Sequence, residues 1–167
     1  PWRNAISCFR KTNMRRAISH AKNGEWPISK AVDGVTLDYE ARHRRRYRLR
    51  THEGEDVLLD LAEAVAMADG DGLRLEDNSW LAVKAGQEDL VEITTDNPQH
   101  LARVAWHLGN RHLLAAINAN RILIRPDHVI ESMVVGLDAR IRHVTEAFQP
   151  EHGAYHEHRD TPLSSAS

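Results

Sequence analysis

The sequence is poor in cysteine and in aromatic residues, and it has no long apolar run. Its 167 residues include one cysteine, Cys8, so an internal disulfide and a cysteine-rich metal knuckle are excluded. No stretch approaches the roughly 20 apolar residues of a membrane helix, and residues 1–16 lack the apolar block of a secretory signal. We therefore expect a cytoplasmic protein without a membrane partner. The hydrophobic fraction of 41% still permits a packed core.

The chain also lacks a large net charge, but its formal charge of −2 hides an asymmetry. Residues 1–50 carry 13 basic and 4 acidic side chains, residues 51–100 carry 2 and 13, and the remainder carries 7 of each. A simple nucleic-acid binder is expected to be basic over a whole domain. We expect the basic and acidic blocks to lie in one folded unit, which makes a nucleic-acid partner the weaker interpretation.

Residues 14–89 are predicted to form a small antiparallel β domain that binds a peptide or protein partner, after a disordered extension at 1–13. Apolar and polar residues alternate in short segments separated by turns such as Glu53-Gly54-Glu55, the pattern of half-buried strands. The two segments on either side of that turn are expected to pair as a hairpin. The alanine-rich stretch 61–68 favours a helix instead. The expected strands are 35–40, 46–50, 57–59, 73–75 and 80–83.

Residues 90–149 are predicted to form a ferredoxin-like βαββαβ domain, which makes the whole chain α+β. Asn97-Pro98 and Asp127 each supply a cap residue before an apolar pattern with helical spacing. The first expected helix begins at Pro98 and stops at Gly109-Asn110, and the second follows its cap Asp127 and ends near 136–138. The expected strands are 91–94, 113–117, 122–124 and 140–144. Residues 150–167 are predicted to be a flexible polar tail.

Histidine is the conspicuous residue, because 11 imidazoles could bind borderline transition metals. His100 and His107 lie seven residues apart in the first helix and are interpreted as surface residues. His112 follows the end of that helix, where either a metal-binding or a purely electrostatic role is open. His128 begins the second helix and could be a metal ligand or a structural residue.

The tail contains three further histidines, His152, His156 and His158. In an extended segment His156 and His158 project to the same side. A flexible segment with several imidazoles can wrap an ion and release it again, because ordering the segment lowers its affinity. The alternative is a solvated, disordered tail.

Six arginines lie within Arg42–Arg50, a segment that alternates like a strand. Such a stripe could bind phosphate or an acidic protein, or it could be a solvated face paired with the acidic block. An RNA-binding or ribosome-associated adaptor is therefore the alternative function. It is weakly supported, since ferredoxin-like sheets recognise RNA with exposed aromatic residues and this chain has two Phe and three Tyr.

Catalytic motifs are not found in the sequence. It contains neither a nucleophile elbow, nor a glycine-rich phosphate loop, nor a His-Glu-x-x-His helix. A metal-dependent hydrolase would need a fixed carboxylate base beside an open metal position, and none is apparent. We therefore expect that the protein is not an enzyme.

Several motifs together resemble the urease accessory protein E family of nickel metallochaperones. The similarity covers residues 14–158 and is strongest at Trp106-His107-Leu108-Gly109-Asn110-Arg111-His112, at Asp127-His128-Val129 and at Phe148–Tyr155. It extends to Val35–Tyr39, His43–Arg46, Val57–Asp60 and Asp69–Leu73. Leu113-Leu114-Ala115-Ala116 departs from the family, which usually has a valine-proline pair there.

The resemblance implies a homodimer that carries Ni²⁺ and delivers it for assembly of the urease active site. His112 would be the interface ligand, paired with the same residue of a second subunit, and His152, His156 or His158 would complete the shell. The implied partners are a GTPase accessory protein and apo-urease. Imidazole nitrogens also suit Cu²⁺ and Zn²⁺. Because imidazole must lose its proton to bind, binding should weaken as the pH falls through about 6.5.

Overall fold

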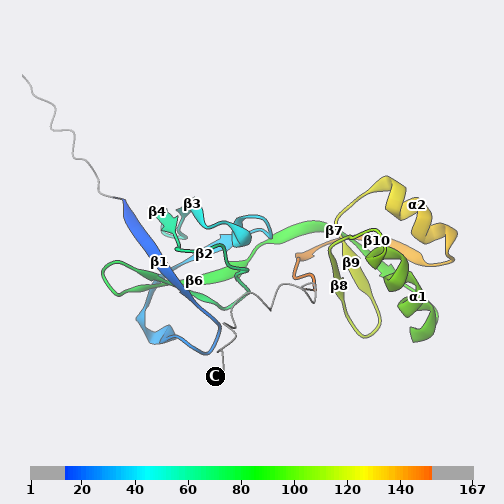
Figure 1. Cartoon of the computed structure of the whole chain (residues 1–167), viewed down its shortest axis with the longest axis horizontal. Coiled ribbons are helices and arrows are strands. Elements are labelled where there is room, and N and C mark those ends of the chain that lie inside the picture. Colours follow the sequence, from blue (N-terminus) through cyan, green and yellow to red (C-terminus); the bar gives the residue numbers. More distant parts are fainter. Residues whose placement is uncertain (1–13, 152–167) are drawn as a thin grey trace, which may run out of the picture. The chain divides into compact units, whose positions relative to one another are not determined.

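A computed structural model describes residues 14–151 of an α+β chain, which divides between Ala85 and Gly86 into two compact units (Figure 1). Unit 1 contains β1 (Arg15–Ala21), β2 (Ala31–Leu37), β3 (Arg46–Arg50), β4 (Asp56–Asp60), β5 (Gly72–Leu75), β6 (Trp80–Ala85) and the single-turn helices η1 (Ile28–Lys30) and η2 (Ala41–His43). Unit 2 contains β7 (Gln87–Thr94), α1 (Pro98–Gly109), β8 (Ala115–Ile117), β9 (Ile122–Ile124), α2 (His128–Gly136) and β10 (Arg140–Ala147). Within residues 14–151, no helix has the length and apolar character needed to cross a membrane.

Unit 1 is built on a six-stranded sheet with the order β2-β6-β5-β1-β4-β3. The predicted hairpin of β3 and β4 is confirmed, with Arg46 opposite Asp60 and Arg50 opposite Asp56. The expectation of an antiparallel β domain holds for three strand pairs and was wrong for two, because β1 is parallel to β4 and β2 is parallel to β6. Hairpins join neighbouring segments and so leave a local signal, whereas parallel pairs need long connections that do not.

Residues 61–68 form no helix, contrary to their alanine-rich composition. The side chains of Leu61 and Met67 are buried in the core of unit 1, with exposed fractions of 5% and 1%. Arg42 is buried as well, and its guanidinium Nη1 donates to the Met67 carbonyl at 3.1 Å. Tertiary contacts therefore override helix propensity here, and Arg42 is not part of the basic stripe that the sequence predicted.

Unit 2 has a four-stranded antiparallel sheet with the order β10-β7-β9-β8. Its elements follow the predicted sequence βαββαβ. The strands β7 and β10 are longer than expected. β7 begins at Gln87, and β10 extends to Ala147, which lies opposite Gln87. The segment from Gln87 to Asp89 is polar and has no apolar alternation, so the sequence does not predict it as a strand. Its pairing with β10 defines it as one.

Both helices begin at their predicted caps. The Asn97 side chain accepts a hydrogen bond from the His100 backbone at 2.9 Å, and the Asp127 carboxylate accepts from the Val129 backbone at 2.9 Å. The apolar faces of α1 and α2 pack together with the inner strands of the sheet. This second core contains Val91, Ile93, Leu101, Val104, Leu108, Ile122, Ile124, Ile130 and Val134.

After β10 the chain stays attached to unit 2. Phe148 is fully buried and Pro150 is buried, and the Glu151 backbone N–H donates to the Ala115 carbonyl at 2.9 Å. Pro150 and Glu151, the first two residues of the predicted tail, are therefore held against unit 2. The three predicted tail ligands, His152, His156 and His158, lie outside the described residues.

Candidate metal centre

His112 lies in the turn that ends α1. The backbone N–H of Arg111 donates to the Leu108 carbonyl at 3.0 Å, and that of His112 donates to the Gly109 carbonyl at 2.9 Å. His112 has a φ of 55°, in the left-handed region that a helix end usually assigns to glycine or asparagine. A side chain at this position costs about 1 kcal/mol of strain. This turn holds an exposed imidazole at a defined point just beyond α1.

A surface pocket of about 310 Å³ opens beside His112. It runs from the loop after α1 to the loop before α2, so residues far apart in the sequence meet in it. Asp127 is among them, although the sequence identified it only as a helix cap. The pocket is lined by His112, Leu113, Leu114, Ile124, Arg125, Pro126, Asp127 and Ile130.

Hydrogen bonding separates the eight histidines of the described region into two groups. Five of them use a ring nitrogen within the fold: His20 contacts Asp71, His43 the Tyr39 carbonyl, His52 Thr36, His100 the Leu137 carbonyl and His143 Glu131. Within residues 14–151, the rings of His107, His112 and His128 make no such bond. An imidazole without a protein partner keeps its lone pair available to a metal ion.

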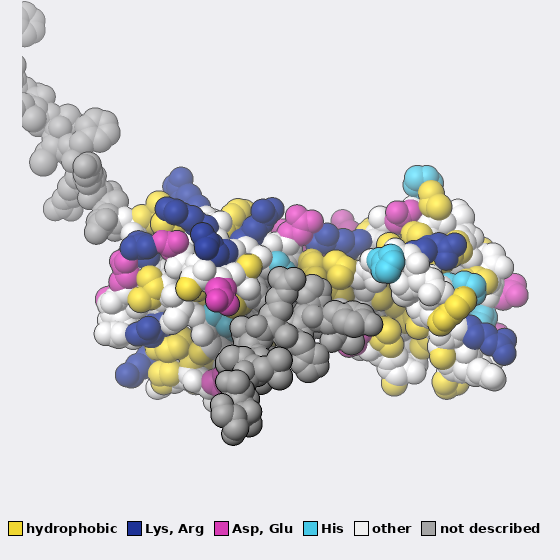
Figure 2. All heavy atoms as spheres, viewed as in Figure 1, with side chains coloured by type: hydrophobic (Ala, Val, Ile, Leu, Met, Phe, Trp, Pro, Cys, Tyr) yellow, Lys and Arg dark blue, Asp and Glu magenta, His cyan; other side chains and the backbone are white. Residues whose placement is uncertain are grey.

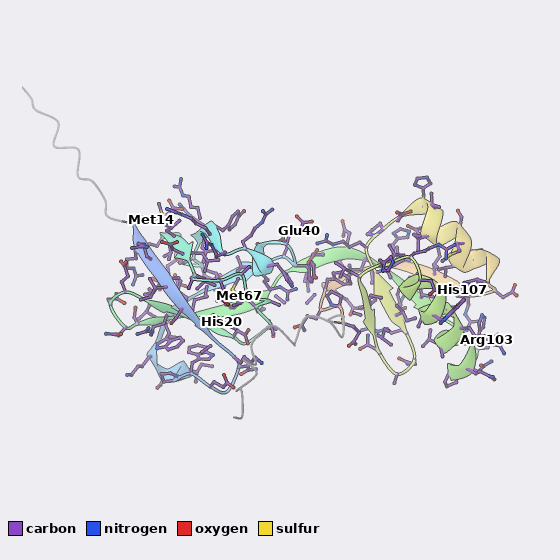
Figure 3. All side chains as sticks on the ribbon, viewed as in Figure 1. Met14, His20, Glu40, Met67, Arg103 and His107 are labelled. Carbon is purple, nitrogen blue, oxygen red and sulfur yellow. The ribbon has the colours of Figure 1, made fainter. Side chains whose placement is uncertain are left out.

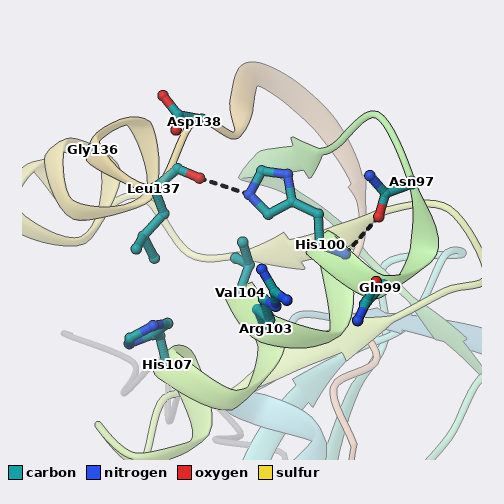
Figure 4. Close-up of a pocket in the computed structure, with 9 residues that line it drawn as sticks. All are labelled: Asn97, Gln99, His100, Arg103, Val104, His107, Gly136, Leu137 and Asp138. Carbon is teal, nitrogen blue, oxygen red and sulfur yellow. Dashed lines mark hydrogen bonds between the residues drawn. The ribbon is translucent and has the colours of Figure 1, made fainter.

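His100 and His107 line one pocket of about 470 Å³ between α1 and the end of α2 (Figure 4). His107 and Arg103 both project from α1 (Figure 3). His100 is more than a surface residue, because its Nε2 donates to the Leu137 carbonyl at 2.6 Å and ties the start of α1 to the end of α2. The sequence missed this role, since the acceptor is a backbone atom 37 residues away.

His128 is the first residue of α2 and is exposed, but it does not line the pocket beside His112. Among residues 14–151, no three His, Cys, Asp or Glu side chains come together in a group that could hold a metal ion. A metal centre that includes His112 would therefore have to take further ligands from outside residues 14–151 or from a second chain. The root of the tail is attached close to His112 in the sequence of unit 2. The Glu151 backbone N–H donates to the carbonyl of Ala115, and Ala115 is three residues after His112.

An exposed histidine that lines an open pocket can present its ring to an ion or to a partner. Two family models match the chain. The UreE urease accessory protein N-terminal domain covers residues 14–86, and the C-terminal domain covers residues 88–165.

Individual proteins agree. A urease accessory protein UreE of Rhizobium rhizogenes is 48% identical over 145 residues, which are 87% of this chain and 86% of that protein. That of Agrobacterium fabrum is 51% identical over 145 residues, 87% of this chain and 89% of that protein. A longer relative from Bradyrhizobium is 50% identical over 127 residues, 76% of this chain and 60% of that protein.

These matches show that the protein is an accessory chaperone and not an enzyme. The chain belongs to the UreE family of urease accessory proteins, with a role in urease maturation.

Proposed function

We propose that the protein is a homodimeric nickel metallochaperone of the cytoplasm. It binds Ni²⁺ with His112 of each subunit and with the tail histidines His152, His156 or His158. It then delivers the ion to a urease maturation complex that contains a GTPase accessory protein and apo-urease. Family membership supports the role in maturation, and the chemistry of His112 supports the ion.

One observation carries the proposal: the ring of His112 makes no hydrogen bond within residues 14–151, and the root of the tail is attached three residues further along the chain, at Ala115. Its position at the end of α1 is fixed by backbone hydrogen bonds, while its side chain remains exposed. The backbone of Glu151, the last described residue, is hydrogen-bonded to Ala115. The first tail histidine, His152, is the next residue in the sequence. A fixed ligand combined with ligands on a tail allows an ion to be bound and then released.

Residues 14–151 do not by themselves bring three metal-binding side chains together, which is compatible with a site shared between two subunits. A two-fold axis that passes beside His112 would place two imidazoles on one ion, and symmetry makes this arrangement automatic. Apolar side chains are exposed nearby, because Leu114 is 43% exposed and Val129 is 62% exposed. In this proposal unit 2 is the ferredoxin-like dimerisation domain and unit 1 binds partners. His128 is a secondary ligand, and Cu²⁺ or Zn²⁺ can replace Ni²⁺ in vitro.

Titration of Ni²⁺ into the full chain, combined with native mass measurement, tests this function. We expect about one ion per two chains. We expect His112→Ala to weaken binding at least tenfold, because removal even of an outer-shell partner of a ligand commonly has an effect of that size. His143→Ala is the matched control, because His143 is also exposed but contacts Glu131 at 3.2 Å. Undiminished affinity in His112→Ala would show that the metal centre lies elsewhere.

A further inference from the structure

Strand β3 is the last strand of the unit 1 sheet and pairs only with β4 among the described strands. Its register is fixed by two flanking hydrogen bonds: Leu61 donates to the Arg45 carbonyl and Thr51 donates to the Glu55 carbonyl, both at 2.9 Å. Odd-numbered residues of β3 therefore direct their backbone groups toward β4, and even-numbered residues direct theirs outward. The outward N–H and C=O groups belong to Arg46, Arg48 and Arg50.

The same edge carries more positive charge than its neighbours neutralise. Arg48 and Arg50 share one carboxylate, Asp56, at 2.6 Å and 3.3 Å. Within residues 14–151, Arg44 and Arg46 have no ion pair. The next carboxylate of β4, Asp60, is paired with Arg16, and its charge is also felt by Arg46, which lies opposite it in the sheet, and by Arg45. Basic side chains gather over β3 and β4 in the space-filling view (Figure 2).

The two faces of the strand differ in character. The side chains of Arg46, Arg48 and Arg50 are exposed on one face, where alternate residues stand about 7 Å apart along the strand. On the other face Leu49 is buried in the core, whereas Tyr47 is 47% exposed. An added strand would therefore meet positive charge on one face and an aromatic ring on the other.

We propose that the open edge of β3 binds an extended acidic segment of a partner protein by strand addition. Carboxylates at alternate positions of that segment pair with Arg46, Arg48 and Arg50, and an apolar residue between them packs on Tyr47. The inference deepens the partner-binding role proposed for unit 1 and does not depend on the metal centre. Outward N–H and C=O groups favour a peptide over RNA, because only a peptide can continue the ladder and Tyr47 offers a single stacking ring.

The test uses the full chain and a fluorescent peptide that alternates glutamate and valine over seven residues. Two N-methylated versions remove either all glutamate or all valine N–H donors. Strand addition requires donors on one edge of the peptide only, so one version loses binding and the other retains it. Equal binding of both versions, or no binding of the parent peptide, would overturn the proposal. Tighter binding of a 12-nucleotide RNA than of the peptide would also overturn it.

Charge is tested on the protein side. The double variant Arg44→Gln with Arg46→Gln should bind the peptide about tenfold more weakly at low salt. The control is Arg103→Gln with Arg140→Gln, which removes two exposed arginines from unit 2 and should not change binding. Unchanged binding in the first variant would contradict the proposal. Ni²⁺ stoichiometry is measured on the same samples, so failure of the peptide site is distinguished from failure of the metal centre.

Discussion

The backbone N–H of Glu151 donates to the carbonyl oxygen of Ala115 at 2.9 Å. Ala115 belongs to β8, the strand at one edge of the unit 2 sheet, whereas β10 forms the opposite edge. The chain that leaves β10 therefore returns across the sheet before the tail begins. This bond fixes the root of the tail beside the strand that follows His112.

Removal of this bond should weaken metal binding without removing a metal ligand. Glu151→Pro eliminates the N–H donor, while Glu151→Ala retains it. We expect Ni²⁺ affinity to fall about threefold to tenfold in Glu151→Pro, the equivalent of one net hydrogen bond. Affinity should be unchanged in Glu151→Ala. Calorimetric titration of both variants provides the measurement, and equal affinities would show that the tail root plays no part.

Glu92 should make stability depend on pH. Its carboxylate is 9% exposed and accepts hydrogen bonds from Arg121 and Arg142, both at 2.8 Å. The bond from Arg121, together with that from Arg142, holds the pKa of Glu92 below its ordinary value of 4.5, although burial raises it. A carboxyl group with a lowered pKa in the folded state stabilises the protein above its ordinary pKa. That contribution is lost as the pH falls below about 4.5.

Glu92→Gln should therefore lower the free energy of unfolding by about 1–2 kcal/mol at pH 7, a value reduced because Arg142 is largely exposed to solvent. The difference from wild type should shrink as the pH falls from 4.5 to 3. Urea unfolding at several pH values gives both quantities. Asp96→Asn serves as the control, because Asp96 is 78% exposed in its pair with Arg140. A difference that stays constant with pH would contradict the expectation.

Gly72→Ala should destabilise unit 1. A Cβ atom at Gly72 would lie 2.5 Å from Cδ2 of Trp26. That ring cannot easily move, since its Nε1 donates to the Gly70 carbonyl at 3.1 Å and the ring stacks on Trp80 at 5.4 Å. We expect the free energy of unfolding to fall by about 1–3 kcal/mol. Urea unfolding monitored by tryptophan fluorescence gives this value. Gly136→Ala, with nothing within 4 Å of its Cβ, should not be destabilised.

The elements that the sequence predicted correctly all depend on neighbouring residues. Asn97 and Asp127 cap their helices through hydrogen bonds to backbone groups two or three residues away. The hairpin of β3 and β4 likewise follows from alternation on both sides of a short turn. Such signals lie within one segment, so composition and spacing suffice to detect them.

The predictions that failed concern contacts between distant segments. The parallel pairing of β1 with β4, the burial of Arg42 against Met67 and the bond from His100 to Leu137 leave no local pattern. Glu151 gave no sign that it would pair with Ala115. Each contact joins residues at least 25 positions apart, where any of many partners would have matched the sequence equally well.

The candidate site shows the same division. By itself the sequence determined the order of elements in unit 2, the two helix caps and the motif that ends at His112, because each depends on residues close in the chain. Only the tertiary structure decided which imidazoles of residues 14–151 are engaged within the fold, because the acceptors that contact His20 and His100 come from distant segments. It also decided where the tail is attached, since a backbone hydrogen bond to Ala115 forms only after β8 and β10 have taken their places at opposite edges of one sheet.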